Sequence, residues 1–236
     1  MKKFSLVLAF FLVGLFLMPG SVFSTPYQDV YLKEVTVNPG SAGAFRFPIL
    51  NGGSVQNVLY GEYDLQIDWD LGSYNYVPIS GFCVDPAWST SLDGQVFSLV
   101  EVSDLDKKYW QAAWIFDQYL LKKVSAQAAQ IAIWETVFDG AGSPVNGDGQ
   151  FYAMFDSTYV TEAAGLITAM LKISDVGDGS DYWIATSPAG GKPILGAGFQ
   201  DYIIRKPVSE PATMLLLGAG LIGLAAFGRK NLLKKV

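Results

Sequence analysis

The sequence predicts an α+β fold: an antiparallel β-sheet or small sandwich with an inserted helical subdomain. Alternating hydrophobic and polar residues between turn signals dominate residues 30–102 and return at 180–206, whereas residues 103–173 follow the helical period of about 3.6. Strands, then helices, then strands indicate an antiparallel sheet with an insertion. At 236 residues, the chain has room for one such domain, predicted at 25–206, plus targeting segments.

Turn residues divide the β segments into predicted strands. Residues 30–37 form the first strand, closed by Asn38-Pro39-Gly40, and residues 44–50 form a second, in which Pro48 suggests an edge position. Asn51-Gly52-Gly53 then gives a hairpin signal. Later strands are predicted at residues 58–69, 74–84, 95–102, 182–186 and 199–205.

Three helices are predicted between the β segments. Ser103 or Asp104 can cap the first, which continues to Leu121. The second follows Ser125, a suitable N-cap, and meets no Gly or Pro before Gly140. The third covers about residues 158–173.

The second helix carries a carboxamide where a hydrophobic side chain is expected. On a helical wheel, Gln130 falls in one stripe with Ala126, Ile133 and Val137. A buried carboxamide is costly unless it is hydrogen-bonded. The only cysteine, Cys83, lies in a strand-like segment. A thiol and a carboxamide can condense with loss of ammonia, so a Cys83–Gln130 thioester would account for both residues.

These two segments resemble the thioester domains of bacterial surface adhesins. Phe82-Cys83-Val84-Asp85 matches the segment that supplies the thiol, and Gln130-Ile131-Ala132-Ile133-Trp134 matches the helix that supplies the acyl group. The resemblance covers roughly residues 76–139. It implies a protected acyl group that captures a nucleophile of a surface partner, such as a protein amine or an exopolysaccharide. Phe82, Asp85, Ile133 and Trp134 would support the bond.

Other interpretations of these residues remain open. A buried free cysteine commonly acts as a small hydrophobic residue, and a buried glutamine can simply join a helix to a sheet. The protein would then be a non-reactive envelope or matrix component of the same fold. A hydrolase could use carboxylates such as Asp85 and Asp93, or a Ser–Lys pair.

Residue counts exclude much enzyme chemistry. The chain has no histidine and one cysteine, which excludes histidine-based triads, thiolate zinc sites and internal disulfides. We therefore predict no enzyme, no catalytic residue, no cofactor and no metal site. Asp175, Asp178 and Asp181 could hold calcium, but their spacing departs from the EF-hand pattern and an acidic turn is the simpler interpretation.

Residues 1–24 read as a secretory signal peptide. Lys2 and Lys3 precede a hydrophobic core over residues 4–18, and Val22-Phe23-Ser24 precede a cleavage site at Thr25. A retained N-terminal anchor is the alternative. Either way, the protein is expected to leave the cytoplasm.

The C-terminal segment, residues 207–236, has three parts. Ser209-Glu210-Pro211-Ala212-Thr213 leads into a hydrophobic stretch, and Arg229, Lys230, Lys234 and Lys235 follow. As a helix, residues 212–228 would span about 25 Å, slightly less than a hydrocarbon core of roughly 30 Å. The basic cluster predicts a cytoplasmic end.

This segment resembles the PEP-CTERM sorting signal of Gram-negative bacteria, with Ser209 in place of the first proline. The resemblance implies an inner-membrane anchor by the C-terminal helix, processing by an exosortase, and delivery to the envelope, cell surface or exopolysaccharide matrix. A permanent single-span anchor is the alternative. If the six basic residues at the two ends are removed and the acidic residues stay, 16 basic and 22 acidic residues become 10 and 22. A net charge of −12 argues against nucleic acid as a partner.

Overall fold

The computed structural model describes residues 28–46, 55–85, 95–142, 151–155, 157–187 and 200–207. The predicted signal peptide and C-terminal segment lie outside these ranges. The elements in chain order are β1 (Gln28–Arg46), β2 (Val55–Asp68), β3 (Val77–Asp85), β4 (Gln95–Glu101), a 3₁₀ turn η1 (Val102–Asp104), α2 (Lys107–Leu120), α3 (Ala126–Asp139), β5 (Tyr152–Ala153), α4 (Thr158–Leu171), β6 (Tyr182–Thr186) and β7 (Asp201–Arg205).

The described strands form one antiparallel sheet that closes on itself. The order is β2-β3-β7-β6-β4-β1-β5, and β1 also pairs with β2, so six strands make a ring to which β5 is added. The predicted α+β class with an antiparallel sheet is confirmed in this form. The sheet closes because β1 is long enough to pair with β2 along most of its length and with β4 near its start.

The predicted break between the first two strands is wrong. Asn38-Pro39-Gly40 does not end the strand, because β1 runs from Gln28 to Arg46. The register with β2 shifts between Asn38 and Ser41, so this segment forms a bulge within the ladder. A bulge accommodates a proline, which lacks the N–H that a regular ladder needs. The hairpin signal at Asn51-Gly52-Gly53 lies outside the described residues.

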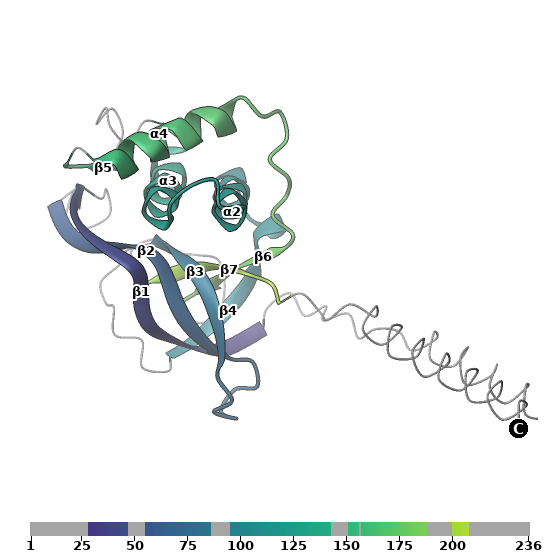
Figure 1. Ribbon diagram of the computed structural model, residues 1–236. Coiled ribbons are helices and arrows are strands. Elements are labelled where there is room, and N and C mark those ends of the chain that lie inside the picture. Colours follow the sequence, from purple (N-terminus) through teal and green to yellow (C-terminus); the bar gives the residue numbers. More distant parts are fainter. Residues whose placement is uncertain are drawn as a thin grey trace, which may run out of the picture.

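The three helices lie together on one side of the sheet, with α3 against the strands and α4 outermost (Figure 1). Helix α3 contacts β1, β2 and β3 on one side and α2 and α4 on the others. All its residues from Ala126 to Val137 are buried. The Ser125 hydroxyl accepts a hydrogen bond from the backbone N–H of Ala128, and Gly140 ends the helix at φ +73°, as the sequence predicted.

The first predicted helix begins later than its expected caps. Ser103 and Asp104 belong to η1, and α2 begins at Lys107 after Asp106. The Trp110 indole N–H donates to the carbonyl of Val102 at 2.9 Å, which ties α2 to this turn. The third predicted helix ends at Leu171 rather than near residue 173. None of the helices within the described ranges is long and hydrophobic enough to cross a membrane, and the predicted helix 212–228 lies outside those ranges.

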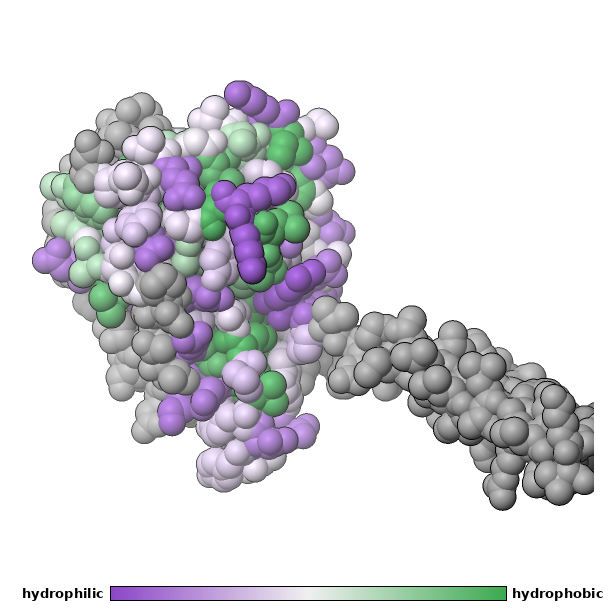
Figure 2. Space-filling view, in the orientation of Figure 1, coloured by the Kyte–Doolittle hydropathy of each residue, from purple (hydrophilic) through white to green (hydrophobic). Residues whose placement is uncertain are grey.

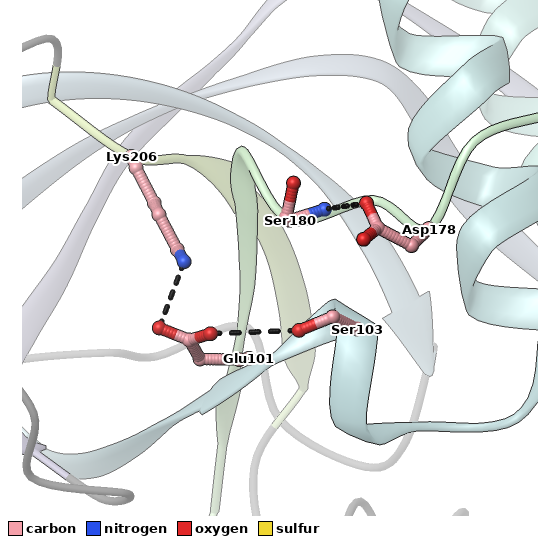
Figure 3. A network of polar contacts seen from close by, with 5 residues as sticks. All are labelled: Glu101, Ser103, Asp178, Ser180 and Lys206. Carbon is pink, nitrogen blue, oxygen red and sulfur yellow. Dashed lines mark hydrogen bonds and ion pairs between the residues drawn. The ribbon is translucent and has the colours of Figure 1, made fainter.

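Polar contacts fix the last described residues (Figure 3). Lys206 forms an ion pair with Glu101 at 2.8 Å, and the Ser103 hydroxyl donates to the same carboxylate. The backbone N–H of Lys206 donates to the carbonyl of Asp181 at 2.8 Å. Nearby, Asp178 accepts from the backbone N–H of Ser180 at 2.9 Å. The end of β7 is therefore held against β4 and the segment that precedes β6.

Candidate site at Cys83 and Gln130

The carboxamide of Gln130 is bound to the backbone of Cys83 at both of its polar atoms. The Cys83 N–H donates to Gln130 Oε1 at 2.9 Å, and Gln130 Nε2 donates to the Cys83 carbonyl at 2.7 Å. Both residues are 0% exposed. Two hydrogen bonds satisfy the buried amide, which would otherwise cost several kcal/mol, about 1–3 for each unpaired group. The structure thus brings the two residues singled out in the sequence into contact.

Gln127, the other glutamine at the start of α3, points elsewhere. Its Nε2 lies 3.4 Å from the hydroxyl of Ser41 on β1. The two glutamines lie three positions apart, slightly less than one helical turn, and their carboxamides reach β1 and β3, which both pair with β2. Gln130 is therefore the glutamine placed at Cys83.

The Cys83 thiol is deeply buried near several polar groups. Burial raises the pKa of the thiol well above its usual value, and the negative charge of Asp85 raises it further. The indole N–H of Trp134 and the backbone N–H of Asp85 act in the opposite direction on this pKa. The thiol is therefore protonated at neutral pH, and two N–H groups are placed to stabilise a thiolate if one forms.

The remaining residues of the two segments are core residues. The Phe82 ring packs edge-on against Phe116 at 4.9 Å and against Tyr119 at 5.2 Å, both on α2. Ile133 is fully buried, and the Trp134 ring lies 5.3 Å from that of Phe45. These aromatic contacts fix β3 and α3 relative to the rest of the core.

A second buried carboxyl lies beside Asp85. Asp201 on β7 is paired with Asp85 across the β3–β7 ladder, and both are buried. Asp201 Oδ1 accepts from the backbone N–H of Ser187 at 2.8 Å. Burial, reinforced by the charge of Asp85 and opposed by the Ser187 hydrogen bond, raises the pKa of Asp201 to about 8. Sequence analysis missed Asp201, since nothing local marks it and its partner is far away in the chain.

This raised pKa predicts a pH-dependent stability. Between about pH 4 and 8 the folded state holds a proton on Asp201 that the unfolded state has lost, so the free energy of unfolding should fall as pH rises through that window. The steepest slope from one such group is about 1.4 kcal/mol per pH unit. Urea unfolding of Asp201→Asn across the same range should show a flatter profile, whereas Asp117→Asn, which removes a carboxylate bonded to the Tyr182 hydroxyl, should not. An unchanged slope in Asp201→Asn would contradict the prediction.

The three aspartates considered for calcium do not converge. Asp175 and Asp178 each accept a hydrogen bond from the backbone N–H two residues further on, at Gly177 and Ser180. No group of three potential metal-ligating side chains occurs within the described ranges. These contacts are those of acidic turns.

Comparison with known proteins identifies the C-terminal segment. Residues 207–230 match the PEP-CTERM protein-sorting motif. This motif includes the predicted Ser209-Glu210-Pro211-Ala212-Thr213 segment, which lies outside the described residues. The chain is therefore an exported protein whose sorting involves an exosortase, with passage through the membrane before processing.

No curated protein and no solved structure matches the chain. The resemblance to thioester-domain adhesins accordingly has no support from these comparisons. It rests on the two sequence segments around Cys83 and Gln130.

Proposed function

We propose that this exported domain forms an internal thioester between Cys83 Sγ and Gln130 Cδ and uses it once to attach covalently to a surface partner. The observation that supports this most directly is the pair of hydrogen bonds that hold the Gln130 carboxamide against Cys83. Reaction of a held pair avoids most of the entropy cost of an encounter, with effective molarities of about 10⁵ M or more in well-aligned cases.

The backbone of Cys83 would assist the condensation at both atoms of the amide. Attack by the sulfur places negative charge on Gln130 Oε1, which already accepts the N–H of Cys83 at 2.9 Å. A donor aimed at a developing oxyanion lowers the barrier. The nitrogen, bonded to the Cys83 carbonyl at 2.7 Å, leaves as ammonia. That hydrogen bond is lost with it, so the product keeps one of the two contacts.

Opening by an amine would transfer the acyl group to the partner. The new amide forms on Gln130, and the sulfur departs as a thiol or thiolate. Burial raises the pKa of the leaving thiol, and the N–H groups of Trp134 and Asp85 near the sulfur oppose that increase, which favours its departure. The reaction occurs once and needs no histidine, so the protein would be a single-use binder and not an enzyme. A lysine amine fits this chemistry, and an exopolysaccharide hydroxyl is the weaker nucleophile.

A non-reactive structural role is the second candidate, and one observation favours it. The Gln130 amide is already satisfied by Cys83, as it would be in a domain that needs only to join α3 to β3. Figure 2 shows hydrophobic side chains on the coloured part of one face as separate patches among polar ones. Covalent chemistry at Cys83 and Gln130 is what distinguishes the first candidate from the second.

Intact mass separates the two candidates. In the reactive case the purified domain, residues 25–206, should be lighter than its sequence by one ammonia and should contain no titratable thiol. Methylamine should add at Gln130 and release one thiol. Because the site is fully buried, we expect addition to be slow in buffer and faster at low denaturant concentration, which promotes local opening.

The control is Cys83→Ala, which should have its full sequence mass and take up no methylamine. A wild-type domain with full sequence mass and one titratable thiol would contradict the thioester and leave the structural role.

A further inference from the structure

The two buried carboxyl groups beside the thiol owe their pairing to an irregularity in the sheet. Along the β3–β7 ladder, Cys83 pairs with Tyr202 and Asp85 pairs with Asp201. An advance of two residues on β3, from Cys83 to Asp85, therefore corresponds to one residue on β7, from Tyr202 to Asp201. A regular ladder would instead place Val84 opposite Asp201. The bulge brings the carboxyl groups opposite each other, and bulges near functional sites commonly re-aim a side chain in this way.

This arrangement lowers the stability of the folded state, so stability does not explain it. Asp201 is 0% exposed, and its Oδ2 has no hydrogen-bond partner among the described residues. Among the described residues, its carboxyl forms no ion pair, and Lys206, the residue that follows β7, is paired with Glu101 instead. Two facing carboxyl groups cannot both ionise easily, so they hold one proton between them near neutral pH.

Among the described residues, the titratable groups coupled to the pair include members of β3, β7 and α2. Cys83 and Asp85 lie on β3, and Asp201 lies on β7. The charges of both carboxyl groups also act on Tyr109, which lies on α2. Burial, then the charges of Asp201 and Asp85, raises the pKa of Tyr109, to which Asp106 also contributes. Tyr109 is therefore neutral. Of these residues, Cys83 is the one whose thiol must lose its proton in the proposed reaction.

We propose that Asp85 and Asp201 form a proton-transfer pair for the Cys83–Gln130 reaction. This role rests on the proposed thioester. When the bond forms, the sulfur–carbon bond replaces the carbon–nitrogen bond, a carboxylate takes the thiol proton, and the neutral carboxyl supplies a proton so that the nitrogen leaves as ammonia. When an amine opens the bond, the pair takes a proton from the attacking nitrogen and returns one to the sulfur. The pair ends each step with its original proton count.

The test uses the secreted domain and the near-isosteric variants Asp201→Asn and Asp85→Asn, with Asp117→Asn as a matched control. Intact mass gives the fraction that carries the bond, and methylamine uptake gives the opening rate, corrected at each pH for the unprotonated amine. General acid–base groups contribute about 10²–10⁴-fold to rate. We expect each site variant to react at least about 10²-fold more slowly than wild type, and the control to match wild type.

The pH profile distinguishes proton transfer from simple structural support. Over the pH range in which Asp85 and Asp201 gain or lose their shared proton, the corrected opening rate of the wild type should change with pH. Asp201→Asn should lose that dependence even if it folds less stably. A bonded wild type with a flat corrected profile, or site variants that react at the wild-type rate, would overturn this role alone. A wild type without the bond would overturn the proposed function and this role together.

Discussion

Replacing Trp134 with alanine should destabilise the folded domain by about 3–5 kcal/mol, the usual cost of removing a fully buried large aromatic side chain. The Trp134 ring is 0% exposed and lies edge-on to Phe45 at 5.3 Å and to Phe151 at 6.2 Å. Its removal would leave a cavity between α3 and the sheet that the surrounding aromatic rings cannot easily close. Urea unfolding monitored by circular dichroism measures the loss.

The matched control for this prediction is Trp114→Ala. Trp114 lies on α2 and is only partly buried against the core, so its loss should cost clearly less. A Trp134→Ala variant as stable as Trp114→Ala would show that the packing around α3 is not as described.

Replacing Gln130 with leucine should be the second large effect, about 2–5 kcal/mol. The change leaves the N–H and the carbonyl of Cys83 buried without their partners, and each such group costs about 1–3 kcal/mol. The comparison is best made in a Cys83→Ala background, where no thioester can form. The free energy of unfolding then reports hydrogen bonding without a contribution from a covalent link.

Gln127→Leu in the same background is the control. Gln127 is also on α3 and nearly buried, but its carboxamide reaches the Ser41 hydroxyl at 3.4 Å and its removal leaves the N–H and the carbonyl of Cys83 paired, so we expect a smaller loss than at Gln130. Equal losses at the two positions would contradict the special role of Gln130. This prediction also means that Gln130→Ala is a poor probe of chemistry, since it perturbs the fold.

The sequence predicted the contact between Cys83 and Gln130 better than it predicted the sheet. Helix α3 could be located because its N-cap, its hydrophobic stripe and its terminal glycine are local signals. The contact between Cys83 and Gln130 followed from a resemblance that spans two short segments. Both depend on residues near one another in the sequence or on a recognisable motif.

Long-range pairing explains what could not be predicted. The sheet closes because β1 passes through Asn38-Pro39-Gly40 as a bulge, whereas those residues favour a turn when read locally. Asp201 meets Asp85 because of a second bulge, between β3 and β7. A bulge depends on which strand pairs with the segment, and the residues of the segment itself do not identify that strand.

The position of β7 has a mechanical consequence. Strand β7 is hydrogen-bonded on both sides, to β3 and β6, and ends one residue before Lys206, where the ion pair with Glu101 holds the chain. The sorting motif begins at residue 207. If the envelope holds the chain by this end while a partner is bonded at Gln130, a pulling force would act along β7. It would then shear the hydrogen bonds that join β7 to β3 and to β6. Hydrogen bonds loaded in this way must break together, so the strand nearest the attachment point is also among those hardest to pull out.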